Sequence, residues 1–108
     1  MKKAILSQPM NGIKEEDIIQ TRDRAIKWLH ENGYEVVNTL FTDEWYKPEN
    51  MEKRGVVNVP LCFLAKSIEN MSKVDTVFFC RGWQNARGCQ AEHFVAKSYG
   101  LHVLYEEG

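Results

Sequence analysis

The residue in this sequence best placed to do chemistry is Glu92, which lies four residues after Gly88 and four before Ala96. On a helix this spacing puts the three residues on one strip, so the carboxylate has the smallest side chains as neighbours and space above it. A carboxylate in such a pocket can attack a sugar carbon as a nucleophile or stabilise an oxocarbenium-like state. The competing interpretation is an ordinary solvated glutamate on a helix surface.

The segment 82–88, Gly-Trp-Gln-Asn-Ala-Arg-Gly, places several ligand-binding groups just before that glutamate. Trp83 supplies a stacking face, Asn85 a bidentate amide and Arg87 a fixed cation. Gly88 leaves room for a ligand near a helix N-terminus. Because a cation is unfavourable in the first turn of a helix, Arg87 implies an anionic ligand or a carboxylate nearby. The alternatives are that Asn85 is a plain helix N-cap and that Arg87 forms a surface ion pair.

A second group of candidate residues is the segment 7–12, Ser-Gln-Pro-Met-Asn-Gly. It combines a hydroxyl, a rigid proline and a glycine at a strand-to-helix turn, where free backbone N–H groups can face a phosphate or a sugar hydroxyl. A tight turn that only reverses the chain explains the same residues equally well. The segment is neither a P-loop nor a GxGxxG motif.

The remaining reactive side chains indicate no metal site. No spacing of His, Cys and Asp resembles a set of metal ligands, and His93 points about 100° away from its neighbour Glu92 around a helix. The three cysteines, Cys62, Cys80 and Cys89, are odd in number and form no CxxC pair, which favours a reducing cytoplasm over a disulfide framework. Cys89 is expected to serve packing.

Charge and hydropathy narrow the class of partner. Fourteen basic and fifteen acidic residues give a net charge of −1, which provides no field to recruit nucleic acid. No apolar run approaches the length needed to span a membrane. We therefore expect a small-molecule partner.

Short apolar strands alternate with helical patterns along the whole chain. Strands are predicted at 3–6, 34–38, 75–80 and 101–105, and helices at 15–32, from 60 to about 73, and at 86–99. The stretch 40–58 has no sustained period and is expected to be irregular or partly helical, as in a functional lid.

This alternation predicts a small α/β domain spanning residues 1–108. The expected fold is a doubly wound, flavodoxin-like parallel sheet of about four to five strands with helices on both faces. In such sheets ligands bind at the carboxyl ends of the strands where the strand order reverses. That rule selects three loops: residues 7–12, the segment after Asn38, and residues 81–88.

Four segments together resemble the nucleoside 2-deoxyribosyltransferase superfamily, in particular a short branch with a Gly-Pro-Met-x-Gly-type first loop. They are residues 7–12, 33–38, 74–77 and 82–92. The last is the most specific, because its Gly-x-x-x-Glu pattern at the start of the final helix carries the superfamily's nucleophilic glutamate, here Glu92. The resemblance implies N-glycosidic chemistry without a metal or an organic cofactor, in which Glu92 attacks C1′ of a deoxynucleoside or nucleotide and the base departs with a proton.

The resemblance also implies binding residues and an assembly. In the phosphate-using hydrolases of the superfamily, hydroxyl and glycine residues hold the 5′-phosphate, a role that falls here to Ser7, Gly12 and Gly88, with added charge from Arg87. The full predicted substrate-binding set is Ser7, Met10, Gly12, Trp83, Asn85, Arg87 and Gly88. A homodimer or larger homo-oligomer is expected, as is usual in the superfamily.

Two departures from the superfamily pattern keep a second hypothesis open. First, Ser67 stands where the transferases carry an aspartate that assists protonation of the base, so Asp43 or Glu44 would have to act as the acid instead. Second, Gln8 stands where the short branch has a glycine. The chain also lacks the C-terminal extension that completes a neighbour's site. The alternative is a non-catalytic nucleotide-binding module in which Glu92 hydrogen-bonds a ribose hydroxyl, and a purely structural or interaction domain ranks third.

Overall fold

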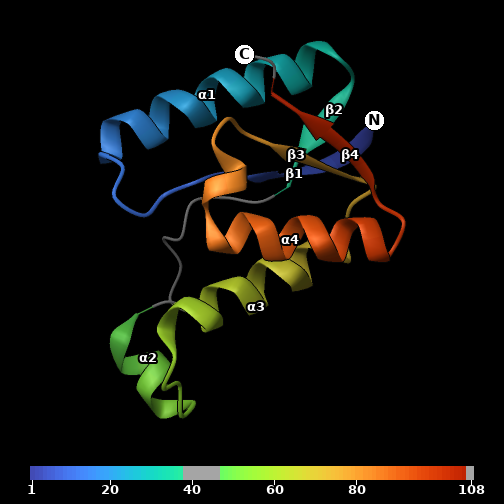
Figure 1. Ribbon diagram of the computed structural model, residues 1–108. Coiled ribbons are helices and arrows are strands. Elements are labelled where there is room, and N and C mark those ends of the chain that lie inside the picture. Colours follow the sequence, from blue (N-terminus) through green and yellow to red (C-terminus); the bar gives the residue numbers. More distant parts are fainter. Residues whose placement is uncertain (38–46, 107–108) are drawn as a thin grey trace.

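The computed structural model describes residues 1–37 and 47–106, which form a four-stranded, all-parallel sheet with helices on both faces (Figure 1). The strands are β1 (Lys2–Ser7), β2 (Tyr34–Val36), β3 (Thr76–Phe79) and β4 (His102–Tyr105), in the order β2-β1-β3-β4. The strand order reverses between β1 and β3, which are paired with Ser7 opposite Phe79. The predicted doubly wound, flavodoxin-like fold is therefore confirmed.

The helices divide between the two faces of the sheet, as the ribbon makes plain (Figure 1). Helix α1 (Glu15–Glu31) covers one face, and α3 (Val59–Met71) and α4 (Arg87–Ser98) lie side by side on the other. The short α2 (Pro48–Lys53) lies beyond the N-terminal end of α3, and a 3-10 turn, η2 (Trp83–Asn85), precedes α4. Within the described residues no helix is long and apolar enough to cross a membrane.

The three predicted long helices are confirmed to within about two residues. Pro60 stands in the first turn of α3 as predicted, and Gly33, whose φ of 87° suits glycine, follows the end of α1. The expected irregular stretch 40–58 contains α2 in its described part. Asn38, Asp43 and Glu44 lie outside the described residues.

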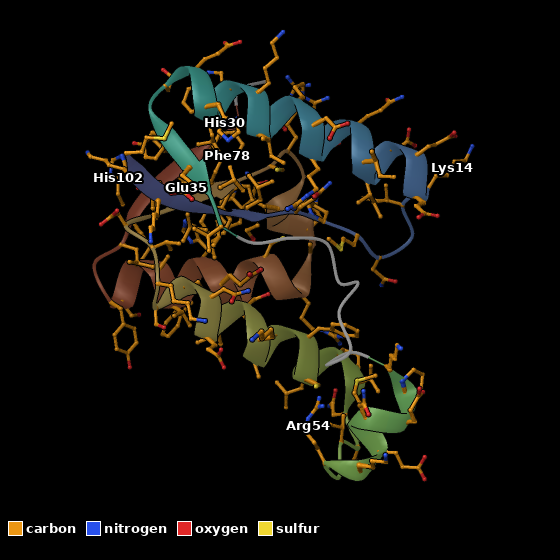
Figure 2. The ribbon with its side chains drawn as sticks, turned by 180° about the vertical axis from the view of Figure 1, so that it is seen from behind. Lys14, His30, Glu35, Arg54, Phe78 and His102 are labelled. Atoms are coloured by element: carbon orange, nitrogen blue, oxygen red, sulfur yellow. The ribbon has the colours of Figure 1, made fainter. Side chains whose placement is uncertain are left out.

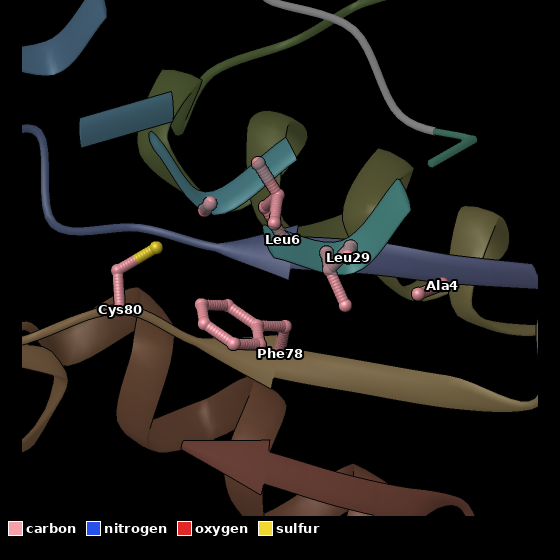
Figure 3. Packing of buried hydrophobic residues seen from close by; sticks show 6 residues of the cluster. Ala4, Leu6, Leu29, Phe78 and Cys80 are labelled. Atoms are coloured by element: carbon pink, nitrogen blue, oxygen red, sulfur yellow. The ribbon is translucent and has the colours of Figure 1, made fainter. Parts of the chain in front are cut away.

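Alternation along the strands produces two hydrophobic cores. Side chains of β1 and β3 that point toward α1 form a cluster with that helix (Figure 3), whose buried members are Ala4, Leu6, Ala25, Leu29, Phe78 and Cys80. The opposite face of the same strands packs against α3 and α4 through Ile5, Met71, Val77, Phe79 and Ala96. This period of two places Ser7, two residues after Ile5, on the face covered by α3 and α4.

The outer side of α3 departs from a simple core helix. Leu61 and Ile68 belong to its apolar spacing, yet their side chains are exposed, whereas Met71 is buried. The inward strip of the helix instead contains Leu64, Ser67 and Met71, which are spaced three and four residues apart. A polar residue, Ser67, is thereby carried toward the interior.

Candidate functional site

Glu92 lies in the second turn of α4 with only 7% of its surface exposed, although it is a charged residue. The Ser7 hydroxyl, at the carboxyl end of β1, donates a hydrogen bond of 3.0 Å to Glu92 Oε1. Ser7 is itself buried, at 1% exposure. Residues 85 positions apart in the sequence thus meet at the point where the strand order of the sheet reverses.

Two further side chains complete the surroundings of this carboxylate. The Ser67 hydroxyl, on the inward strip of α3, favours the charged form of Glu92. Cys89, one turn before Glu92 on α4, is buried. The carboxylate therefore sits among three small polar groups that come from β1, α3 and α4.

Burial dominates the electrostatics of the site. Removal from water raises the pKa of Glu92 from 4.5 to about 7, although the hydrogen bonds from Ser7 and Ser67 each favour the charged form. Burial also raises the pKa of the Cys89 thiol to about 11. At neutral pH the site therefore holds a neutral thiol and a carboxyl group that exchanges readily between its two protonation states.

The N-terminus of α4 is open toward solvent. Its N-cap residue, Ala86, supplies no side-chain hydrogen bond, and no acidic residue stands in the first turn. Among the described residues no carboxylate lies within ion-pair distance of Arg87. A Cβ built on Gly88 would meet no heavy atom within 4 Å outside its own stretch of helix. Gly88 is therefore exposed, with open space beside its backbone.

The first loop forms a turn that contacts the third loop. The Ile13 N–H donates to the Met10 carbonyl at 3.1 Å, and Gly12 has a φ of 77°, a conformation that favours glycine. A Cβ on Gly82 would lie 3.7 Å from Cγ of Pro9, so the two loops touch. The backbone of this loop therefore forms a tight turn, as one of the two interpretations of its sequence expects.

Gln8 ties the same loop to α1. Its side-chain amide donates to the Ile18 carbonyl at 2.6 Å, while its own Oε1 is buried without a partner in the described part of the chain. A glycine here, as in the short branch of the superfamily, has no side chain to make this bond. Gln8 therefore fixes the start of the loop that follows Ser7.

The Trp83 ring contacts other aromatic side chains, although its place in the sequence just before Glu92 suggests a role at that carboxylate. Its ring stacks on His93 with centroids 4.2 Å apart and packs against Phe79 and Tyr105. The His93 ring also hydrogen-bonds the Tyr105 hydroxyl at 2.7 Å, from Nε2. Since His93 points well around the helix from Glu92, Trp83 belongs to this aromatic cluster on the β4 side.

Asn85 is not an N-cap of α4 but the last residue of η2, where its backbone N–H donates to the Gly82 carbonyl at 3.0 Å. Its side chain is exposed. The structure thus brings Ser7, Gly88 and Glu92 to one place on β1 and α4, with Arg87 beside them. It does not place Trp83 or Asn85 in contact with Glu92 through any interaction among the described residues.

A hollow of about 350 Å³ opens on the β4 side of these loops, lined by Arg81, Gly82, Trp83, Gln84, Tyr105 and Glu106. The Glu106 carboxylate is held there by Arg24 Nε at 2.7 Å and by the backbone N–H of Arg81 at 3.0 Å. Burial opposes ionisation of this group, but together these hydrogen bonds lower the pKa of Glu106 below its ordinary value. The ion pair joins α1 to the end of β4.

The other histidines lie away from the site. His30, at the end of α1, and His102, at the start of β4, are at the end of the sheet opposite to the Ser7 side (Figure 2). Within residues 1–37 and 47–106, no group of three or more His, Cys, Asp or Glu side chains is arranged to hold a metal ion.

The packing role expected of Cys89 agrees with its burial, at 3% exposure. The sequence does not predict the inward position of Ser67. The available signal was position: Ser67 precedes the buried Met71 by four residues, and Cys89 precedes Glu92 by three. Each therefore shares a helix face with a buried residue.

A family model described as "Domain of unknown function (DUF4406)" matches residues 2–105. The chain belongs to the DUF4406 family. Comparison with curated proteins found no match, and comparison with solved structures found none. The chemistry of this DUF4406 chain must therefore be argued from its own site.

Three properties of the Glu92 site in this DUF4406 protein bear on what it can do chemically. Its buried carboxyl group has a pKa near neutrality and accepts a hydrogen bond from the Ser7 hydroxyl. It lies one turn from an open helix N-terminus, which attracts anions. Such a group can attack an electrophilic carbon or exchange a proton at neutral pH.

Proposed function

We propose that this protein cleaves or transfers the N-glycosidic bond of a deoxynucleoside or a nucleoside 5′-monophosphate, with Glu92 as the nucleophile. The observation that carries the proposal is the buried Glu92 carboxylate, which accepts a hydrogen bond from Ser7 where the strand order reverses. A surface glutamate has no need of such partners. The resemblance of residues 82–92 to the nucleoside 2-deoxyribosyltransferase superfamily supports the same role.

The proposed reaction has two steps. A Glu92 carboxylate oxygen forms a bond to C1′ while the bond from C1′ to the base nitrogen breaks, and the base takes one proton from solvent as it leaves. Water, or the nitrogen of a second base, then attacks C1′ and gives one proton to solvent, while the bond from C1′ to the Glu92 oxygen breaks and the carboxylate is released. The ionised form is needed for the first step, so a pKa of about 7 gives a usable fraction of nucleophile at neutral pH.

A phosphate on the substrate would be held at the N-terminus of α4. Gly88 leaves space there, Arg87 adds a positive charge, and the backbone N–H groups of the first turn point outward. Ser7 contributes less to this role than its place in the first loop suggested, because its hydroxyl donates to Glu92. We assign Ser7 to the carboxylate, and Arg87 and Gly88 to the anion.

The test is incubation of purified protein with a panel of deoxynucleosides and their 5′-monophosphates, with free base followed by chromatography. We expect wild type to release base from at least one substrate and Glu92→Gln to release none above background. If wild type and Glu92→Gln act alike on a good substrate, Glu92 is not the nucleophile. If no substrate of the panel yields base, N-glycosidic cleavage of these substrates is excluded.

The second candidate function is a non-catalytic nucleotide-binding module, and Ser67 is the observation that favours it. This position holds a hydroxyl rather than an acid, so no proton donor for the leaving base is assigned among the described residues. Calorimetry separates the two functions. Stoichiometric binding without product after long incubation supports the module, whereas turnover excludes it.

We further infer a homodimer or larger homo-oligomer in a reducing cytoplasm. Exposed apolar side chains on the two helices of one face support self-association: Leu61 and Ile68 on α3, and Phe94, which is 73% exposed, on α4. The three cysteines are free thiols, which suits a reducing compartment. Light scattering is expected to give at least twice the mass of the chain for wild type and a lower mass for Phe94→Glu. A monomeric wild type would contradict the oligomer.

A further inference from the structure

The hollow on the β4 side has groups that the chemistry proposed for Glu92 does not use. Its volume of about 350 Å³ lies within the range of sites for small ligands. The lining comes from residues 81–84, in the loop after β3, and from Tyr105 and Glu106 at the end of β4. Neither Ser7 nor Glu92 lines it, so the hollow is separate from the Glu92 site.

One wall of the hollow is aromatic. The rings of Trp83 and Tyr105 have centroids 5.7 Å apart and are inclined by only 29°. Two side chains that do not line the hollow hold these rings. Phe79 packs against both of them, and His93 stacks on Trp83 and hydrogen-bonds the Tyr105 hydroxyl. A planar ligand therefore meets a surface that is already ordered, which lowers the entropic cost of binding.

The other wall is charged. The largely buried Glu106 carboxylate accepts hydrogen bonds from Arg24 Nε at 2.7 Å and from the backbone N–H of Arg81 at 3.0 Å. Arg81 Nε lies 4.0 Å from Glu106 Oε1, and the Arg81 side chain is still 56% exposed. These two guanidinium groups and one carboxylate leave an excess of one positive charge, which favours an anion.

We propose that this hollow is a binding site for a small aromatic carboxylate, whose ring lies against Trp83 and Tyr105 and whose carboxylate bonds the Arg81 guanidinium. A single guanidinium matches one carboxylate with two parallel bonds, and the excess of one positive charge suits a monoanion. A neutral ring would use only the aromatic wall, and an aliphatic acid only the charged one. The proposed function of Glu92 is not needed for this site.

The experiment is a titration of ¹⁵N-labelled protein with indole-3-acetate, followed by the NMR signals of the tryptophan indole N–H groups. Trp83→Phe assigns the Trp83 signal. We expect this signal to shift with a Kd of about 1 mM or lower, the affinity usual for a ligand of this size. The signal of Trp28, an exposed tryptophan on α1, serves as the internal control and is expected to stay in place.

Variants separate the two walls, with the backbone N–H of Gly82 as the reporter. Arg81→Gln keeps the backbone N–H that bonds Glu106 and loses the guanidinium, so it is expected to bind indole-3-acetate about tenfold more weakly. Neutral indole is expected to bind wild type and Arg81→Gln equally. Trp83→Leu is expected to weaken both probes several-fold, whereas the matched control Trp28→Leu should weaken neither.

Three results would overturn the proposal. One is an unmoved Trp83 signal in wild type at about ten times the expected Kd. Another is equal affinity of wild type and Arg81→Gln for indole-3-acetate. The third is loss of binding in Glu92→Gln, which would place the probe at the Glu92 site. Base release and probe binding are measured separately, so failure of one leaves the other standing.

Discussion

Replacing Glu92 by Gln is expected to stabilise the protein at alkaline pH. Glu92 is buried and its pKa is raised from 4.5 to about 7, so between these values the folded state binds a proton that the unfolded state has lost. The stabilisation that comes from the neutral Glu92 side chain is fully present below pH 4.5, the pKa of glutamate in the unfolded chain. It is lost as the pH rises through about 7, the pKa of Glu92 in the folded protein. Glutamine stays neutral, so its variant loses nothing in this window.

The size of the effect follows from the same shift. At about 1.4 kcal/mol per pKa unit, the change from 4.5 to about 7 corresponds to a loss on the order of 3 kcal/mol in wild type above the folded pKa. The glutamine carbonyl can still accept the hydrogen bond from Ser7. The variant should therefore match wild type near pH 4.5 and exceed it by about that amount at pH 8.

The assay is urea unfolding of both proteins at a series of pH values from 4.5 to 8, from which the difference in unfolding free energy is plotted. Other titrating groups cancel in this difference, so its slope reports Glu92 alone. Parallel curves for the two proteins would show that Glu92 titrates normally, and the account of a buried, perturbed carboxyl would then be wrong.

Three further outcomes are expected. Gly88→Ala should leave the unfolding free energy equal or up to about 1 kcal/mol higher, because a Cβ at this position meets no neighbour. The same variant should bind a 5′-monophosphate more weakly in calorimetry. An unchanged affinity would show that Gly88 is not part of the site. Glu106→Gln should lower the unfolding free energy by about 1–3 kcal/mol at pH 7, because the variant loses the charged bond to Arg24. The difference in unfolding free energy between wild type and variant should fade below about pH 4.5, where the carboxylate becomes protonated. A difference that stays constant with pH in urea unfolding would contradict this. A thiol reagent should modify Cys62 rapidly in the native protein, and should modify the buried Cys80 and Cys89 only after unfolding. Rapid modification of all three cysteines in the native protein would contradict the core packing.

Much of the fold could be predicted because the local patterns agree with the tertiary structure. Apolar runs of four to six residues between amphipathic helices become parallel strands, and the alternation in β1 decides which face each side chain takes. The rule that ligands bind where the strand order reverses selects the loops 7–12 and 81–88. The structure places the Ser7–Glu92 hydrogen bond next to these two loops.

The orientation of the third loop could not be predicted. Trp83 and Arg87 are close in sequence to Glu92, but η2 and the start of α4 turn the Trp83 ring toward His93 and Tyr105. A tryptophan finds more apolar contact in that cluster than at an open, charged helix end. Nearness in sequence gives no direction around a helix.

The inward face of α3 could not be predicted for a related reason. The apolar residues of α3 lie on two strips, and the one with Leu61 and Ile68 is exposed. Only the packing of α3 beside α4 decides which strip faces inward.

The most direct test of the central claim is detection of the covalent intermediate on Glu92. Wild type is mixed with a deoxynucleoside that it cleaves, quenched with acid, digested and examined by mass spectrometry. We expect the peptide that contains Glu92 to carry one deoxyribosyl group, and the Glu92→Gln protein to carry none and to release no base. Release of base by both proteins, with no adduct on that peptide, would contradict the assignment of Glu92 as the nucleophile.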